Sequence, residues 1–215
     1  MNIKQLDFEG FYIKKETRKS QITLHHTAGG GKAIDVANYW KTIINKKTGL
    51  PQKICTSYII EKDGTVVQLF DTIYGGGHIG DCAREFKLLN LSEITLGPYA
   101  IGIEIISWGF LQMRNNKLYN GAGKEFKGDF IKLDKKYKGF EYFEKYTAEQ
   151  LKAVQELLPA ISAKHNISLR YNEDIWDINT RALTLQNGLF THNSYRLDKS
   201  DVYPDPDLIN ILTTF

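Results

Sequence analysis

Short apolar runs separated by turn-forming residues dominate the first half of the chain. The run QITLHH leads into the glycine cluster TAGGG, which predicts a strand ending near His26. The stretch TSYIIEKDGTVVQLFD has two β-branched and aromatic runs on either side of Asp63-Gly64, the pattern of an antiparallel hairpin. The run AIGIEIISWG is apolar except at Glu104, which predicts a buried central strand. A later strand, NGLFTH, is predicted to end at His192.

Three other segments are predicted to be helical. Residues 33–46 carry apolar side chains at helical spacing and lead into a basic, glycine-containing stop signal, KKTG. Thr147 and Gln150 form a capping box that opens a second helix, which we expect to kink at Pro159. A final short helix is expected after Pro206.

The order of these elements and the length of the chain predict one domain. Strands and helices interleave without internal repeats, which favours an α/β fold with a central mixed sheet flanked by helices. At 215 residues the chain suits a single domain, 1–215, with its core at about 20–207. Its 42% hydrophobic and 25% charged content argues against collagen-like, coiled-coil and disordered chains.

Residues 110–146 form a basic and aromatic segment inserted into this pattern. They contain nine Lys or Arg against five Asp or Glu, a local excess of 9 − 5 = +4, together with nine aromatic residues. We expect an elaborated surface loop whose aromatic side chains dock onto the body of the protein, in preference to a substrate-binding flap.

Charge and cysteine content narrow the function classes. The net charge of 28 − 25 = +3 suits an anionic polymer such as cell wall and is too small for a dedicated nucleic-acid binder. Cys55 and Cys82 lie 27 positions apart, so they form neither a disulfide framework nor a thiolate zinc knuckle. A metal would therefore depend on His and carboxylate ligands. We find no apolar run of signal-peptide or membrane-spanning length, and we expect a protein made in the cytoplasm.

Two of the five histidines lie where a sheet presents side chains to a cleft. His25 and His192 each end a predicted strand beside a loop, whereas His165, in the polar tail of the capped helix, is interpreted as an ordinary surface residue. Hydrolytic zinc sites use three protein ligands and leave a fourth position open. After His192 the chain offers Asp201 as a third ligand, with three competing carboxylates at Asp198, Asp205 and Asp207.

Glu104 is unusual because it interrupts an apolar strand. Burying an ionised carboxylate without a partner costs several kcal/mol, so this residue is paired, lies at a strand surface, or is retained for chemistry. Desolvation would raise its pKa toward the range of a general base.

At this point the sequence resembles the zinc-dependent N-acetylmuramoyl-L-alanine amidases, which share a fold with the peptidoglycan-recognition proteins. The resemblance is carried, in order, by ITLHHTAG, YIIEKDGTVVQLFD, YGGGHIGD, AIGIEI, YFEKYTAEQLKAVQELL and GLFTHNSYRLDKSD. These segments cover most of residues 20–207.

The resemblance implies a role for individual residues. His25, His192 and Asp201 would be the ligands of one Zn²⁺ ion, with His25 preferred to His26, which strand alternation points to the opposite face. Glu104 would be the general base and Lys199 the stabiliser of the transition state. The resemblance also implies that His78 and Thr27 contact the substrate.

Two departures from the family pattern bear on the site. Cys55-Thr56-Ser57 stands where the family often has a His or Tyr before the YII run. Val202-Tyr203-Pro204-Asp205 replaces the usual Pro-Gly after Asp201, which leaves Asp205 as an alternative third ligand, although Asp201 is the nearer fit.

The implied activity is hydrolysis of the amide bond between N-acetylmuramic acid and L-alanine in peptidoglycan, by a phage-type endolysin that acts on the wall after release. Two alternatives stay open: a non-catalytic peptidoglycan-binding module, and a zinc peptidase that acts within the stem peptide. We expect a monomer with peptidoglycan as its partner, and we expect neither nucleic acid nor a membrane span.

Overall fold

The centre of the molecule is a six-stranded mixed sheet. The computed structural model describes residues 3–46 and 48–215. The strand order is β1-β4-β3-β5-β2-β10, and every neighbouring pair is parallel except the β3–β4 hairpin. In that order the strands are β1 (Ile3–Gln5), β4 (Val66–Gln68), β3 (Tyr58–Ile60), β5 (Ala100–Ile105), β2 (Gln21–His26) and β10 (Gly188–Thr191).

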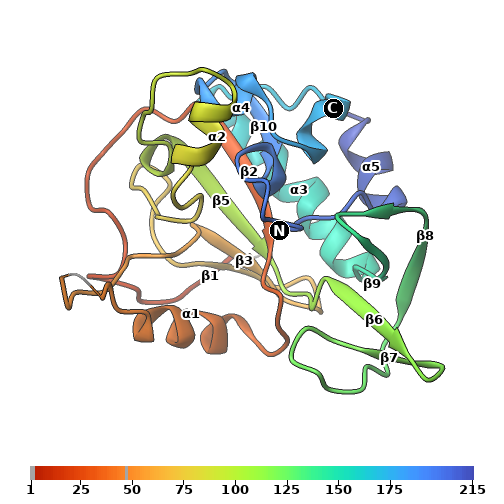
Figure 1. Cartoon of the computed structure of the whole chain (residues 1–215). Helices are drawn as coiled ribbons and strands as arrows, with labels where there is room; N and C mark the ends of the chain where they lie inside the picture. The colour runs from red at the N-terminus through yellow and green to blue at the C-terminus, as the bar shows by residue number, and fades with distance from the viewer. Residues whose placement is uncertain (1–2, 47) are drawn as a thin grey trace.

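Helices lie on both sides of this sheet. Figure 1 shows α1 on one side and α3 and α5 on the other. The helices are α1 (Ala33–Thr42), α2 (Ala83–Leu88), α3 (Ala148–His165), α4 (Thr180–Leu183) and α5 (Pro206–Leu212), with 3₁₀ turns η1 (Gly97–Tyr99), η2 (Glu173–Trp176) and η3 (His192–Ser194). The predicted α/β class and the mixed sheet flanked by helices are confirmed.

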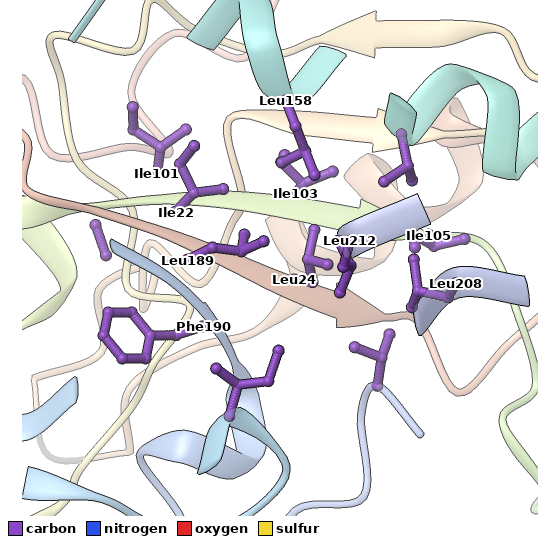
Figure 2. Close-up of a cluster of buried hydrophobic side chains, with 14 of the residues drawn as sticks. Ile22, Leu24, Ile101, Ile103, Ile105, Leu158, Leu189, Phe190, Leu208 and Leu212 are labelled. Carbon is purple, nitrogen blue, oxygen red and sulfur yellow. The ribbon is translucent and has the colours of Figure 1, made fainter. Parts of the chain in front are cut away.

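Strand alternation divides the apolar side chains into two cores. On one face, Leu24 and Ile103 pack with Leu158 of α3 and with Leu208 of α5, as Figure 2 shows. The other core lies between the sheet and α1, where Ile59 is fully buried among α1 and N-terminal residues. Complete burial of one such side chain contributes about 1.5–3 kcal/mol. The first core thus holds both β2 and β5 through their buried apolar side chains.

The predicted hairpin is present, and the predicted first helix is too long. Gly64 adopts a φ of +78° at the β3–β4 turn, which favours glycine. α1 ends at Thr42, because Ile43 is extended and Ile44 forms a β-bridge with Pro51. Lys47, part of the predicted stop signal, lies outside the described residues. The central strand is also shorter than the predicted run AIGIEIISWG, because β5 ends at Ile105.

The segment 110–146 forms a second, four-stranded antiparallel sheet. Its order is β7-β6-β9-β8, made of β7 (Lys117–Tyr119), β6 (Phe110–Arg114), β9 (Phe140–Glu144) and β8 (Phe130–Tyr137). The expectation of a surface loop was therefore wrong: these strands face solvent with charged side chains, so they lack the apolar runs that identified the central strands. The expected docking of aromatic residues is confirmed, because Phe143 and Tyr146 are buried in the main core.

The capping box that opens α3 is formed as predicted. The Thr147 hydroxyl oxygen accepts a hydrogen bond from the Gln150 backbone N–H at 3.0 Å, and the Gln150 side chain accepts one from the Thr147 N–H at 3.1 Å. The Thr147 hydroxyl also donates to the Lys62 carbonyl at 2.7 Å, which ties the helix start to the β3–β4 turn. α3 continues through Pro159 to His165, and the kink there stays a prediction.

We expect Thr147→Ala to lower the free energy of unfolding by about 1 kcal/mol, because the substitution removes the cap acceptor. Thr147→Ser keeps the hydroxyl and should stay close to the wild type. Urea denaturation of the three proteins measures the difference, and an alanine variant as stable as wild type would show that the cap contributes nothing.

Candidate active site

Parallel pairing brings three of the predicted site residues into one row across the sheet. His25 of β2 lies opposite Glu104 of β5 in the register of these strands. Thr191 of β10 lies opposite Leu24 of β2, so His192, the next residue, continues the row beside His25. Neighbours at the same register position point to the same face of a sheet. Two imidazoles and a carboxyl group therefore meet at the carboxyl ends of the parallel strands.

Asp201 completes a tight cluster with the two imidazoles. The His25 Nδ1 atom lies 3.1 Å from the His192 Nδ1 atom. The Asp201 Oδ2 atom lies 3.2 Å from His25 Nδ1 and 2.9 Å from His192 Nδ1. The fold thus brings His25, near the start of the chain, within 3.2 Å of His192 and Asp201, near its end.

This cluster fits a zinc ion by its donor chemistry and its spacing. Zinc held at about 2.0–2.1 Å in tetrahedral geometry separates its donor atoms by about 3.3 Å, close to the three distances found here. Burial, aided by the nearby His192, lowers the pKa of His25 to about 4, so this ring is neutral at neutral pH. Neutral imidazole and ionised carboxylate are the forms that bind metal.

Asp205, the alternative third ligand, is engaged elsewhere. Its Oδ1 atom accepts hydrogen bonds from the backbone N–H groups of Asp207 and Leu208 and so caps α5. Its Oδ2 atom lies 2.8 Å from the Tyr203 hydroxyl. The geometry therefore favours Asp201.

Two residues that the sequence analysis did not identify hold the Asp201 segment in place. The Asn193 amide group donates to the carbonyl oxygens of Asp201 at 3.0 Å and Val202 at 2.8 Å. The Tyr203 ring stacks between Phe143 and Tyr146, with centroid distances of 4.4 and 5.0 Å. Asn193 directly follows a candidate ligand in the sequence, which is the only local signal that could have pointed to it.

Glu104 and Lys199 line a cavity of about 270 Å³ with the three clustered residues. Glu104 is 7% exposed, and no described residue donates a hydrogen bond to its carboxyl group. Burial raises the pKa of Glu104 well above the usual value, the charge of Asp201 raises it further, and Lys199 acts in the opposite direction. A carboxyl group with a raised pKa in a cleft is suited to proton transfer.

Thr27 and His78 line the same cavity, but their polar atoms already have partners in the protein. The Thr27 hydroxyl oxygen lies within hydrogen-bonding distance of the carbonyl oxygens of Gly29 and Ser107, which share its single hydrogen, and it accepts from the Ser107 N–H. Both ring nitrogens of His78 lie within hydrogen-bonding distance of His25 or Ala100. Their predicted contacts with substrate stay predictions.

The remaining two histidines, His26 and His165, are not part of the cluster, and His26 borders the cavity. His26 points to the opposite face of β2, as strand alternation predicted, and its Nδ1 atom lies 3.1 Å from the Tyr146 hydroxyl. His165 lies 2.7 Å from the Thr72 hydroxyl, away from the cavity.

A mixed α/β sheet whose carboxyl edge carries two imidazoles, a carboxylate and a buried glutamate has the residue types that hydrolytic metal sites use. Comparison with known families identifies the family of proteins to which the chain belongs. The sequence profile of the N-acetylmuramoyl-L-alanine amidases matches residues 16–204, and the chain belongs to this family of peptidoglycan amidases. The match contains every residue of the site, so the predicted family and enzyme class are confirmed.

Solved structures of an amidase, of AmpD and of an endolysin share this fold at low sequence identity. The N-acetylmuramoyl-L-alanine amidase LysC from Clostridium intestinale URNW is 14% identical, with a TM-score of 0.51 over 99% of this chain and 97% of its own. A selenomethionine derivative of AmpD is 13% identical, with a TM-score of 0.52 over 97% of this chain and 93% of its own. A mutant endolysin from Bacillus subtilis is 17% identical, with a TM-score of 0.50 over 99% and 97% of the two chains.

A curated relative and, within the described part of the chain, a membrane-spanning helix were both sought, and neither was found. No curated protein matches the sequence significantly. Among the residues that the structure describes, no helix combines the length and the apolarity needed to cross a bilayer.

We expect Asn193→Ala to destabilise the protein by about 1–3 kcal/mol, because the buried carbonyl oxygen of Val202 and the partly buried one of Asp201 lose their donor. Asn172 also donates from its side chain to a backbone carbonyl, that of Arg170, but this bond is exposed. Asn172→Ala should therefore change stability by less than about 0.5 kcal/mol. Urea denaturation of both variants tests the difference, and equal effects would contradict a clamping role for Asn193.

Proposed function

We propose that this chain is a zinc-dependent N-acetylmuramoyl-L-alanine amidase that hydrolyses the bond between the lactyl group of N-acetylmuramic acid and L-alanine in bacterial peptidoglycan. The observation that carries the proposal is the convergence of His25, His192 and Asp201 beside the buried carboxyl group of Glu104. A module that only binds peptidoglycan has no need of this complete set.

His25, His192 and Asp201 would hold the zinc ion through two Nδ1 atoms and one carboxylate oxygen. When bound there, zinc would supply Lewis acidity to the scissile carbonyl group and to the attacking water. The three side chains line the cavity, through which we propose that the substrate approaches.

Glu104 is proposed as the general base. Its carboxylate would take a proton from the water as the water oxygen attacks the amide carbon, and it would return that proton to the leaving nitrogen of L-alanine. The C–N bond then breaks to give a free lactyl carboxylate and a free amine. The lack of a donor to Glu104 from the described residues leaves both its oxygens available for this exchange.

Lys199 is proposed to stabilise the transition state. It lines the cavity close enough to Glu104 to influence its pKa, and it is partly exposed. An ammonium group at this position would stabilise the negative charge that builds on the amide oxygen during attack.

We propose that the substrate-binding groove extends from this cavity along α1. A neighbouring cavity of about 420 Å³ shares Thr27, Trp40 and Glu104 with the first and is also lined by Tyr39. Aromatic rings provide flat apolar surfaces against which sugar or peptide groups can pack. We propose that the glycan and stem peptide lie across these two cavities.

We also propose an endolysin role, in which the enzyme acts on the cell wall after release from the cytoplasm of the host cell. The shared fold with the Bacillus subtilis endolysin supports this role. The net charge of +3 would favour approach to the anionic wall.

Digestion of purified peptidoglycan with and without a chelator tests the proposed reaction. We expect new lactyl termini and free L-alanine amines, loss of both after chelation, and recovery when zinc is added back. Mass spectrometry of the products identifies the termini. Cleavage within the stem peptide would indicate a zinc peptidase, sedimentation with the wall without cleavage would indicate a binding module, and either result would overturn the proposal.

Two substitutions separate the roles of base and ligand. Glu104→Ala should lower the rate of hydrolysis by about 10²–10⁴-fold while leaving the zinc content near one ion per chain, because only the proton acceptor is lost. His192→Ala should lose both activity and zinc. Glu173→Ala, at an exposed position, is the control and should resemble wild type. Full activity in Glu104→Ala would show that the proposed base is wrong.

A further inference from the structure

We propose that His78 is a positioning residue that holds the candidate ligand His25 in the tautomer that presents a bare Nδ1 atom to the metal position. This inference rests on the proposed function, because it concerns the outer support of the proposed metal site. It assigns to His78 a role different from the substrate contact implied by its sequence context.

A chain of three polar groups fixes the tautomer of His25. The His78 Nε2 atom lies 3.3 Å from the Ala100 carbonyl oxygen, and a carbonyl oxygen only accepts hydrogen bonds. His78 must therefore carry its hydrogen on Nε2, which leaves a lone pair on Nδ1 in the neutral ring. That Nδ1 atom lies 2.9 Å from His25 Nε2 and accepts its hydrogen. The Nδ1 atom of His25 then has no hydrogen and faces His192 and Asp201.

Ile79, the next residue of the same loop, fixes the tautomer of the second candidate ligand, His192. The Ile79 carbonyl oxygen lies 3.1 Å from His192 Nε2, so this nitrogen donates and the His192 Nδ1 atom is left bare. Two consecutive residues, His78 and Ile79, thus orient both candidate histidine ligands. Such outer hydrogen bonds select the tautomer and the ring orientation of metal-binding histidines.

Close packing holds His78 in position. A side chain on Gly102 of β5 would place its Cβ 2.9 Å from the His78 Cγ atom, so the ring lies directly against the strand backbone. A Cβ on Gly76 would clash with the Cys55 carbonyl oxygen, because the loop packs directly against that backbone. His78 is 8% exposed and His25 is 2% exposed. The lack of a side chain at glycines of the YGGGH run therefore lets the loop pack closely, which buries the His78 imidazole beside His25.

The two rings meet in an orientation suited to this bond. Their planes are 87° apart, with centroids separated by 4.9 Å. An edge-on approach lets the N–H of one ring meet the in-plane lone pair of the other, whereas stacked rings would not. Among the described residues, His78 is the only partner within hydrogen-bonding distance of His25 Nε2.

The first test reads the tautomers in metal-free protein, where activity plays no part. Long-range ¹H–¹⁵N correlation spectra of histidine-labelled protein at neutral pH distinguish Nδ1–H from Nε2–H rings. We expect His25 and His78 in the Nε2–H form, with the His25 signal assigned by its loss in His25→Gln. A His25 ring in the Nδ1–H form would overturn the proposal, whatever the metal content.

The second test uses a substitution that removes the acceptor and one that restores it. His78→Leu leaves His25 Nε2 without a partner and should weaken zinc binding by about 10–100-fold. His78→Asn can place its Oδ1 atom where Nδ1 stood and should recover most of that affinity. His165→Leu, far from the cavity, is the matched control. Competition with a chromophoric chelator measures all three, and the tautomer of His25 is read again in each variant.

The outcomes separate this proposal from the proposed function. Unchanged zinc affinity in His78→Leu, or equal losses in the leucine and asparagine variants, would overturn the positioning role and leave the amidase proposal intact. If the wild type binds no zinc, the proposed function fails, while the tautomer measurement still decides whether His78 orients His25. If His78→Leu does not fold, the wild-type spectrum and His78→Asn still test the proposal.

Discussion

The site depends on the register between three parallel strands. β2 pairs with β5 on one side and with β10 on the other. In this register His25 lies opposite Glu104, and His192, the residue after β10, lies beside His25. A shift of one residue in either pairing would turn a side chain of this row to the opposite face, where Leu24 and Ile103 pack against α3 and α5. The apolar core therefore stabilises the polar row, because the same alternation that buries isoleucine and leucine aims the functional groups at the cavity.

Burying so many polar groups lowers stability unless each has a partner. The structure provides partners from the backbone: the carbonyl oxygens of Ala100 and Ile79 accept from ring nitrogens. Among the described residues, Asn193 Oδ1 is the fully buried side-chain polar atom that has no partner. Glu104 also receives no hydrogen bond from the described residues, but it lines the cavity. The candidate histidine ligands thus have partners within the protein, whereas the carboxyl group that would act in the reaction has no protein donor and borders the cavity.

The second sheet supports the site from outside. Phe143 of β9 and the neighbouring Tyr146 enclose the Tyr203 ring two residues beyond Asp201, so the inserted segment is packed against the chain that carries a candidate ligand. Its edge strand β8 carries several lysines, among them Lys132, which keep an open sheet edge from pairing with other chains. The basic character of the segment thus has a structural explanation of its own.

Local patterns in the sequence determined the hairpin at Asp63-Gly64, the capping box at Thr147, and the residue types of the site, because each depends on neighbours along the chain. Only the tertiary structure revealed the second sheet, because its strands carry solvent-facing charged side chains. It also decided between Asp201 and Asp205 as the third candidate ligand, because the Asp205 carboxylate caps α5. The same holds for the bonds from His78 to His25 and from Asn193 to the Asp201 segment. Spacing along a chain does not fix which of several similar side chains meet, because contacts between distant segments depend on how the whole core packs.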